Sequence, residues 1–391
     1  MRRIATWSVV LLLVLTTAGL GVGGWIYSEE MLPAPLPWDP EFDVEVLAVH
    51  PQEGRIVLDT DRGDLVELDL IGLRTERGLV VLQGDATPAG SGIERHGALL
   101  TGTWPEAGDL GRPEVSVYAG RPDDTLGLAT DVVVVPGELG PMPAWRVEPV
   151  ARADDTTWAV LVHGRGGDLH EPNRLLPLLG ELGLPSLTIS VRNDPDAAAD
   201  PDGWGRFGDT EWEDLEAAVR YLRDVEGAER FVLVGYSQGA AIVLNHLRRS
   251  EHAWDVEAAV LISPLVSLNA TLRQQAQLRE IPDPLIAPLV AAAQVVSRLR
   301  SGMVAGNLEH ARDARELMTP MLLTHGDADT TVPIEPSREL AQARPDLVIY
   351  EEYPGVEHVR EWNADRVRFE ADLRAFLVNE VAAVEQLAAA S

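Results

Sequence analysis

Residues 231–241 are Phe-Val-Leu-Val-Gly-Tyr-Ser-Gln-Gly-Ala-Ala, and this stretch decides the fold. Its apolar, β-branched start predicts a buried strand, and a helical pattern begins immediately after Gly239. Gly-x-Ser-x-Gly between a strand and a helix is typical of a nucleophile elbow, which exposes the serine Oγ above the sheet. Gly235 and Gly239 would omit side chains that clash as strand and helix meet. The alternative is a glycine-rich loop in which Ser237 is incidental.

Composition excludes several classes of protein. The 391 residues are 46% hydrophobic, enough for a large α/β domain with an extra module. There are 62 acidic against 32 basic side chains, a net charge of −30, and no lysine. Such a surface repels nucleic acid, so we expect no nucleic-acid partner. The absence of cysteine removes disulfides, zinc–thiolate sites and a catalytic thiol.

The N-terminus predicts a membrane anchor over residues 1–30. Arg2 and Arg3 precede an uncharged stretch, residues 4–27, that is long enough to cross a hydrocarbon core of ~30 Å. The positive-inside rule places the N-terminus in the cytoplasm and the catalytic domain outside the cell membrane, with Trp25 and Tyr27 at the outer interface. The alternative is a cleaved signal peptide and a secreted protein.

Two segments separate this anchor from the main domain. Prolines dominate residues 31–41 and predict a stiff, extended linker. Residues 42–110 alternate apolar and polar positions between Gly and Asp turns, which predicts a small module of half-buried antiparallel strands. The module is too short for a β-propeller and carries no motif with recognisable chemistry.

Residues 111–391 predict an α/β domain with a mostly parallel sheet covered by helices. A hairpin is expected over 131–147. Apolar runs then alternate with helical patterns, as crossover connections require. Strands are expected at 158–162, 186–191, 230–234, 257–262, 321–324 and 348–353. A helical insertion at about 267–317 interrupts this rhythm and predicts a short cap over the carboxyl ends of the strands.

A serine nucleophile needs an acid and a base, and candidates follow Ser237 in the expected order. Asp329 lies in the loop after the strand at 321–324, and Asp327 is the second choice. His358 lies in the loop after the last strand and is the predicted base. His325 competes for this role but is expected to shape the acid loop.

The oxyanion hole is expected to use two backbone N–H groups. One belongs to Gln238, after the nucleophile, and the other to Arg165, in a glycine-rich loop after an early strand. The Arg165 side chain would meet an anionic substrate group or lie at the surface. Four further candidates for the pocket are His163, Gly164, Tyr236 and Arg192. No cofactor and no metal are expected, because no ligand spacing for either is present.

Together these motifs resemble those of the α/β-hydrolase superfamily over about residues 115–377. The motifs are His163-Gly164, Gly235-Tyr236-Ser237-Gln238-Gly239, Gly326-Asp327-Ala328-Asp329 with Val332-Pro333, and Gly355-Val356-Glu357-His358. The chain looks most like exported or membrane-anchored serine hydrolases of actinobacteria, near the prolyl-oligopeptidase-like and monoglyceride-lipase-like branches. The resemblance implies Ser237 as nucleophile, His358 as base and Asp329 as orienting acid. It fixes no substrate, because this fold hosts many chemistries.

The sequence thus predicts a serine hydrolase that cleaves a carboxylic ester through an acyl-enzyme. A peptidase or amidase of the same fold is the second choice, and the substrate is a small-molecule ester or a peptide. A hypothesis of another class is a non-catalytic, membrane-tethered binding protein on the same scaffold. The complete Ser–Asp–His set disfavours it. The oligomeric state is left open.

Overall fold

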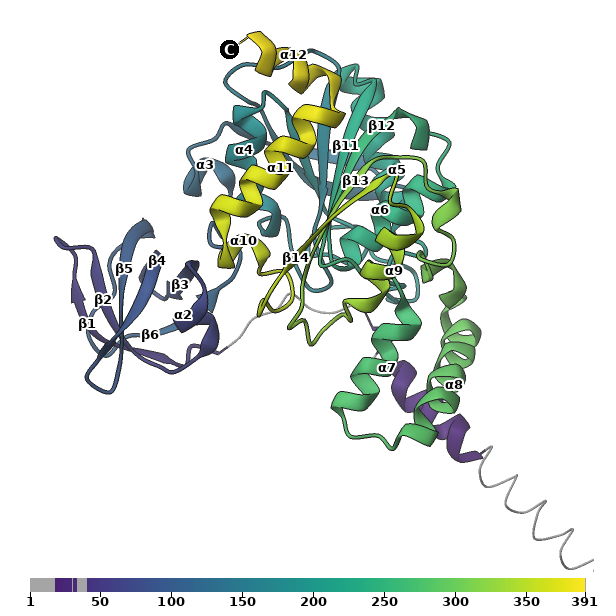
Figure 1. Ribbon diagram of the computed structural model, residues 1–391, viewed down its shortest axis with the longest axis horizontal. Coiled ribbons are helices and arrows are strands. Elements are labelled where there is room, and N and C mark those ends of the chain that lie inside the picture. Colours follow the sequence, from purple (N-terminus) through teal and green to yellow (C-terminus); the bar gives the residue numbers. More distant parts are fainter. Residues whose placement is uncertain (1–17, 30, 34–40, 391) are drawn as a thin grey trace, which may run out of the picture.

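The computed structural model describes residues 18–29, 31–33 and 41–390. In Figure 1 a small β-barrel stands beside a larger α/β domain, and a helical arm projects from the opposite side of that domain. The residues of the candidate site lie where the barrel and the α/β domain meet.

The barrel is a closed, fully antiparallel set of six strands in the order β1-β2-β5-β4-β3-β6. Its interior is filled by aliphatic side chains such as Ile56, Leu58 and Leu73, all fully buried. The expected strands of residues 42–110 therefore close on themselves, and the last one ends at Glu114. The elements are β1 (Val44–His50), β2 (Arg55–Asp59), α2 (Gly63–Glu67), β3 (Leu70–Thr75), β4 (Gly78–Ala89), β5 (Gly92–Gly102) and β6 (Leu110–Glu114).

An eight-stranded sheet forms the centre of the α/β domain, in the order β14-β13-β12-β11-β9-β10-β8-β7. The β7–β8 hairpin is antiparallel, β8 joins β10 antiparallel, and the remaining neighbours are parallel. All expected strands are confirmed, with ends shifted by at most two residues. They are β7 (Thr130–Pro136), β8 (Pro141–Val147), β9 (Thr157–Val162), β10 (Ser186–Ile189), β11 (Arg230–Tyr236), β12 (Val256–Ile262), β13 (Met321–Gly326) and β14 (Val348–Tyr353).

Helices cover both faces of this sheet. In the central strand β9, Val160 joins one buried core and Leu161 the other, so both faces are shielded from water. The first core includes side chains of α5 (Trp212–Tyr221), α6 (Gln238–Arg249) and α9 (Glu335–Ala343). The second includes side chains of α4 (Leu176–Glu181), α11 (Arg366–Glu380) and α12 (Ala382–Ala390). Shorter elements connect these: α3 (Pro122–Thr125), α10 (Glu361–Ala364), the 3₁₀ turns η1 (Glu171–Leu175), η3 (Ala253–Asp255), η4 (Ala305–Leu308) and η5 (Ala314–Glu316), and the π turn η2 (Leu222–Glu226).

The helical insertion forms the projecting arm. It contains α7 (Leu268–Leu278) and α8 (Asp283–Ser301), which pack against the helix of residues 18–29 (Figure 1). The Tyr27 hydroxyl donates to the carbonyl of Leu272 at 2.9 Å. Gly24 permits this packing, because a Cβ there would lie 2.9 Å from the backbone of Ala292.

The N-terminal expectations need correction where they reach the described residues. Tyr27, expected at a membrane interface, is 6% exposed inside the arm, because its hydroxyl finds a carbonyl partner there. Residues 31–33, expected in an extended linker, are packed on the α/β domain, with Leu32 fully buried. No helix among the described residues combines the length and apolarity that a membrane crossing requires. Residues 1–17 and 34–40, which carry most of both segments, lie outside the described residues.

The Asn363 amide helps to join the barrel to the α/β domain. The Asn363 side chain, in α10, is fully buried and donates to the carbonyls of Leu70 and Val115 at 2.9 and 3.0 Å. Its Oδ1 accepts from the Arg174 guanidinium at 2.7 Å. Because buried polar groups are costly when unpaired, this four-residue network fixes the barrel against α10.

Candidate active site

Ser237 lies at the turn between β11 and α6, in strained backbone with φ 51° and ψ −111°. Its N–H donates to the carbonyl of Ile262 at 2.9 Å, and its own carbonyl accepts from Leu265 N at 3.1 Å. These two bonds hold a conformation that L-residues rarely adopt. The sequence prediction of a tight strand–turn–helix element at this position is confirmed.

Both glycines of the elbow are required by close approach. A Cβ on Gly235 would lie 2.5 Å from Ala240 N, in the first turn of α6. A Cβ on Gly239 would lie 2.3 Å from the carbonyl oxygen of Val162, at the end of β9. Gly235 thus lets the helix fold back on its own strand, and Gly239 lets it approach the neighbouring strand.

Ser237, His358 and Asp329 form one chain of hydrogen bonds. His358 Nε2 lies 2.8 Å from Ser237 Oγ, and His358 Nδ1 lies 2.6 Å from Asp329 Oδ2. The carboxylate accepts from Nδ1–H, which leaves Nε2 free to accept the serine proton. Three side chains from loops after β11, β13 and β14 therefore meet in the order and roles expected of a nucleophile, an acid and a base.

The acid loop keeps Asp329 ionised. Its Oδ1 accepts from the backbone N–H groups of Thr331 and Val332, both at 2.8 Å. His325 Nε2 lies 3.1 Å from Oδ2, and His325 itself is fully buried. Burial alone would raise the pKa of Asp329, but hydrogen bonds from His325 and His358 outweigh it and hold that pKa well below its usual range.

His325 and Asp327, the alternative candidates for base and acid, hold the loops that carry Asp329 and His358. His325 is held by Ser337 Oγ at 2.8 Å on its other nitrogen, so it shapes the acid loop as expected and does not approach Ser237. Asp327 is exposed and accepts from Gly355 N at 2.5 Å, which closes the turn before His358.

The loop that carries His358 is itself strained and clamped. Val359 has φ 58°, which is rare for a β-branched residue. Its N–H donates to Ser263 Oγ at 3.0 Å and its carbonyl accepts from Arg174 at 3.1 Å. Ser263 in turn donates to the fully buried carboxyl group of Glu361 at 2.7 Å. These bonds fix the direction in which His358 leaves the backbone.

Two backbone N–H groups remain for an oxyanion. Among the described residues, neither Gln238 N nor Arg165 N donates to another atom. Gly164 N, by contrast, donates to Glu171 Oε2 at 2.6 Å, which holds the glycine-rich loop in place. The Arg165 side chain points elsewhere: it donates to the carbonyls of Met31 and Pro33 at 3.0 and 2.9 Å. It therefore clamps the N-terminal segment.

His163 forms a buried ion pair beneath this loop. Its Nδ1 lies 2.8 Å from Gly164 O and its Nε2 2.7 Å from Asp194 Oδ2. Both neighbours are acceptors, so both ring nitrogens carry protons. Burial lowers the pKa of His163, but the charge and hydrogen bond of Asp194 overcome this and raise it to about 9.

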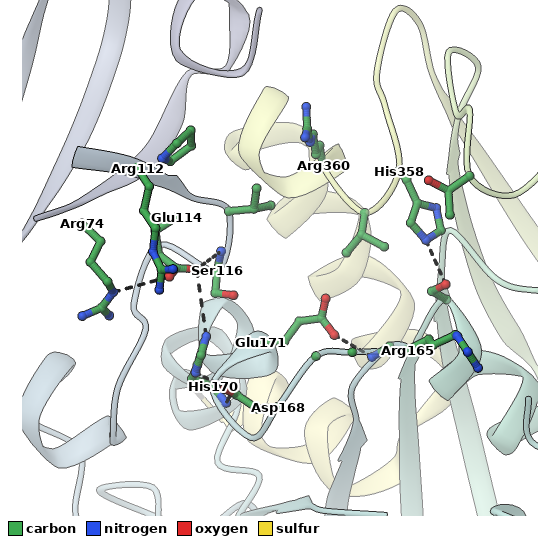
Figure 2. Close-up of a pocket in the computed structure, with 18 residues that line it drawn as sticks. Arg74, Arg112, Glu114, Ser116, Arg165, Asp168, His170, Glu171, His358 and Arg360 are labelled. Atoms are coloured by element: carbon green, nitrogen blue, oxygen red, sulfur yellow. Dashed lines mark hydrogen bonds and ion pairs between the residues drawn. The ribbon is translucent and has the colours of Figure 1, made fainter. Parts of the chain in front are cut away.

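A cavity of about 930 Å³ opens in front of Ser237, between the barrel and the α/β domain (Figure 2). Arg74, Arg112 and Glu114 enter it from the barrel side, and His358 and Arg360 from the α/β domain. No described residue of the helical insertion lines it. The insertion therefore does not line this cavity, although α7 reaches the carboxyl end of β13: Gln274 donates to the carbonyl of Asp329 at 3.0 Å and Gln275 to that of Thr330 at 2.9 Å.

Three candidate pocket residues do not line this cavity. Tyr236 is 1% exposed, with its ring 5.2 Å beneath the Arg174 guanidinium. Arg192 is 6% exposed and binds Asp214 through its backbone N–H and its guanidinium, at 2.8–2.9 Å. Arg192 and His163 line only a small second cavity of about 20 Å³, room for about one water molecule. Gly164 lines both cavities.

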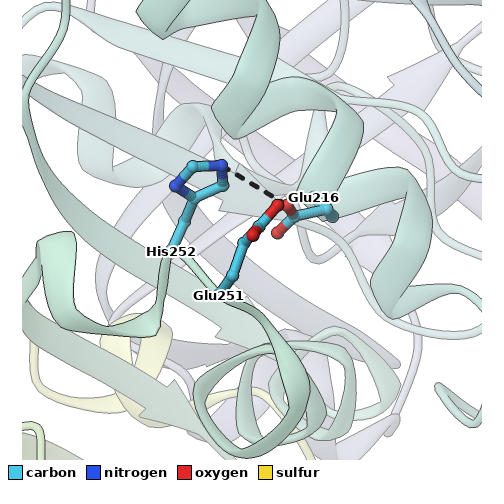
Figure 3. Close-up of side chains that lie close together, drawn as sticks. All are labelled: Glu216, Glu251 and His252. Atoms are coloured by element: carbon cyan, nitrogen blue, oxygen red, sulfur yellow. Dashed lines mark ion pairs between the residues drawn. The ribbon is translucent and has the colours of Figure 1, made fainter.

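A cluster of possible cation ligands lies outside the site. Ligand atoms of Glu216, Glu251 and His252 lie within 4.8 Å of one another (Figure 3). Their existing contacts explain the cluster: Glu216 accepts from Ser250 Oγ at 2.5 Å, and His252 Nδ1 lies 3.2 Å from Asp255. The cluster links α5 to the turn after α6, and we assign no metal to it.

Several residues of the site have no sequence signal of their own. Ser263, Arg174 and Asn363 act on the His358 loop through contacts that no motif announces. The only sequence signal for Arg360 is its position two residues after His358. Glu171 is closest to predictable, because it follows the glycine-rich loop directly.

Comparisons with known proteins agree with the fold. The model of the alpha/beta hydrolase family matches residues 132–388, which leaves the barrel outside the match. An esterase of Pyrococcus furiosus, Pf2001, is similar in two crystal forms. One form has a TM-score of 0.54 at 21% identity and covers 68% of this chain. The other has a TM-score of 0.52 at 20% identity and covers 67% of this chain. Each covers 96% of the esterase. The esterase Est2 of Thermogutta terrifontis has a TM-score of 0.49 at 18% identity, covering 64% of this chain and 92% of its own.

Among curated proteins, no sequence relative was found. The structural likenesses concern the fold alone, and the narrower resemblance to the prolyl-oligopeptidase-like or monoglyceride-lipase-like branches stays a prediction. The family match covers well over half of the sequence and includes all three members of the hydrogen-bonded chain at Ser237. The chain therefore belongs to the alpha/beta hydrolase family.

Proposed function

We propose that this protein is a serine hydrolase that cleaves a carboxylic ester through an acyl-enzyme at Ser237. The observation that carries the proposal is the unbroken hydrogen-bond chain from Ser237 through His358 to Asp329. A non-catalytic scaffold has no need to keep a serine in strained backbone at 2.8 Å from a histidine oriented by a buried carboxylate. We propose an ester as the substrate because the Pyrococcus furiosus protein with a similar fold is named an esterase.

The steps follow from the geometry. Ser237 Oγ attacks the ester carbonyl carbon while His358 Nε2 takes its proton. Asp329 stabilises the imidazolium that forms, and the N–H groups of Gln238 and Arg165 donate to the oxyanion. The tetrahedral intermediate collapses as His358 returns the proton to the leaving alkoxide. Water then attacks the acyl-enzyme with His358 again as base, which releases the acid and restores Ser237.

Labelling with a fluorophosphonate probe tests the nucleophile. We expect the wild-type protein to label covalently and Ser237→Ala to remain unlabelled, since the probe phosphonylates an activated serine. Equal labelling of both proteins would contradict the proposal. Rates of hydrolysis of an ester and of the matching amide, measured separately on the wild-type protein, distinguish esterase from amidase activity.

Paired aspartate variants test the acid. Asp329→Asn is expected to lower kcat for a 4-nitrophenyl ester by about 10⁴-fold, because the amide favours the wrong histidine tautomer. Asp327→Asn is the control, since Asp327 only closes the turn at Gly355. It should stay within a few-fold of wild type. Similar losses in the two variants would mean that the acid is misassigned.

We also propose that the uncharged run that starts at residue 4, together with the helical arm it leads into, holds the protein at a membrane, with the α/β domain outside the cytoplasm. Two arginines before an uncharged run support this orientation. Exposed apolar side chains in the helical arm add support, because such groups suit a lipid surface. They are Val22, Trp25 and Ile26 of the N-terminal helix and Leu285, Val295 and Leu299 of α8.

A further inference from the structure

Arg165 connects the proposed oxyanion hole to the N-terminal segment. Its backbone N–H is the second donor expected at the hole, whereas its side chain leaves the site and donates to the carbonyls of Met31 and Pro33. These acceptors lie 134 and 132 positions earlier in the chain. They also lie outside residues 132–388, which the family model matches. A residue of the hydrolase fold is thus fastened by a part of the chain that the fold itself does not include.

The backbone around Arg165 has little support of its own. Gly164 N donates to Glu171, and Gly164 O accepts from Gly167 N at 3.1 Å. Between them Gly166 adopts φ 72°, a conformation that favours glycine. Among the described residues, neither the N–H nor the carbonyl of Arg165 makes a hydrogen bond. The side chain is therefore what fixes this residue within a glycine-rich loop.

The Arg165 guanidinium is held in one place. It lies over the Phe207 ring, 4.5 Å from the ring centroid. Within the described part of the chain, both of its hydrogen bonds run from Nη2 to residues 31–33, and Nη1 is buried without a partner. Because unpaired buried donors are costly, loss of the two carbonyl acceptors would leave this guanidinium without a reason to stay there.

Residues 31–33 are built firmly into the α/β domain beside this loop. Leu32 is fully buried and shares an apolar cluster with Phe207. The Leu32 carbonyl accepts from Gly205 N at 2.7 Å, and Pro33 forms an antiparallel bridge with Trp204. The two acceptors of the Arg165 side chain therefore belong to a fixed surface.

We infer that residues 31–33 position the oxyanion hole, because they fix, through the Arg165 side chain, the peptide group whose N–H meets the oxyanion. This inference rests on the proposed function for the reaction, whereas the docking of residues 31–33 does not depend on catalysis. Oxyanion stabilisation requires donors that are already in place before the charge develops. A small displacement of Arg165 N therefore weakens binding of the transition state more than binding of the ester.

Two arginine variants separate this role from general support of the N-terminal segment. Arg165→Met removes the two hydrogen bonds but keeps the N–H and an unbranched apolar side chain beside Phe207. We expect kcat for a 4-nitrophenyl ester to fall by about tenfold or more while KM changes by less than about threefold, because the oxyanion exists only after attack.

Arg300→Met is the matched control. Arg300 also holds the N-terminal segment, since it donates to Ser28 Oγ at 2.6 Å and to Glu29 at 2.8 Å, but it does not contact the glycine-rich loop. Its kcat should stay within a few-fold of wild type. An unchanged kcat in Arg165→Met, with or without a rise in KM, overturns the inference, and so do equal losses of kcat in the two variants.

Displacing the segment while Arg165 stays intact should have the same effect. A carboxylate cannot remain unpaired at the buried position of Leu32, so Leu32→Asp is expected to release residues 31–33 and lower kcat about as much as Arg165→Met. The double variant should be no slower than Arg165→Met alone, since both changes break one interaction. Additive losses in the double variant would contradict a common route through Arg165.

Accessibility of a thiol reports the docking of the segment without any substrate. The chain has no cysteine, so Met31→Cys supplies a single thiol at a position 5% exposed. Its reaction with a maleimide should be slow and should accelerate by about tenfold or more in Met31→Cys/Leu32→Asp. A thiol in Met31→Cys that reacts as fast as in urea would show that the segment is not docked, and the inference would fall. Where Leu32→Asp does not expose the thiol or does not fold, the Arg165→Met and Arg300→Met pair decides.

The two failures are distinguishable. If wild type hydrolyses no ester while the thiol is protected, the segment is docked and the proposed reaction is wrong. If wild type is active and Leu32→Asp exposes the thiol without lowering kcat, the esterase function stands and the positioning role of residues 31–33 is wrong.

Discussion

His163 shows how much one buried residue can contribute at the site. It keeps its charge while 3% exposed, because Asp194 and the Gly164 carbonyl face its two nitrogens. An imidazolium beneath the glycine-rich loop stabilises the loop that carries Arg165 N. Ser237 and Val359 also depend on their surroundings, because hydrogen bonds to nearby residues hold each of them in strained backbone.

The pH dependence of stability tests this ion pair. The pKa of His163 is about 9 in the folded protein against 6.5 when unfolded, so its contribution is complete below pH 6.5 and is lost as pH rises through 9. The free energy of unfolding in urea should fall by about 3 kcal/mol over that interval. Asp194→Asn should remove this decline, whereas Asp202→Asn, at an exposed position, should retain it. Identical slopes in the two variants would contradict the assignment.

The three side chains of the proposed triad were predictable at this scale because each belongs to a motif at a strand end. Ser237, Asp329 and His358 follow β11, β13 and β14, and the sheet brings those ends together. Ser263 and Arg174 were not predictable as parts of the site. Their hydrogen bonds to Val359 span 96 and 185 residues of sequence, and no local pattern indicates them.

At the scale of elements, the elbow depends on two close approaches between strands and helix. Gly239→Ala places a methyl group 2.3 Å from the Val162 carbonyl, and backbone cannot retreat as a flexible side chain would. We expect a loss of about 3 kcal/mol or more in the free energy of unfolding. Gly180→Ala, in α4 with open space around it, should be neutral or stabilising by up to about 1 kcal/mol. Urea unfolding of both proteins provides the measurement, and similar values for the two would refute the argument.

The strands of the sheet and the helices of the insertion were predicted, but the packing of the insertion on the N-terminal helix was not. Buried parallel strands are continuous apolar runs bounded by turns, so β9 to β14 are visible in the sequence. The position of α7 and α8 is set by their packing on residues 18–29, some 250 residues earlier. Helical periodicity identifies such helices but says nothing about the surface they cover.

For the whole molecule, the proposed membrane orientation has a direct test, because the chain contains no cysteine. A single Val225→Cys, at a position 62% exposed on the α/β domain, should react with an impermeant maleimide on intact cells. Arg2→Cys should react only after lysis. Labelling of Val225→Cys only after lysis would contradict the orientation. Absence of Arg2→Cys from the mature protein would indicate cleavage of a signal peptide.

The joint made by Asn363 has a consequence for the order of events during synthesis. The barrel is made first, whereas His358 and Asn363 follow its last strand by more than 240 residues. Until those last residues emerge and fold, the barrel has no partner for its Leu70 carbonyl, and Ser237 has no base. An incomplete chain therefore lacks the proposed base. Docking of the segment that carries His358 and Asn363 both joins the barrel to the α/β domain and places the base beside Ser237.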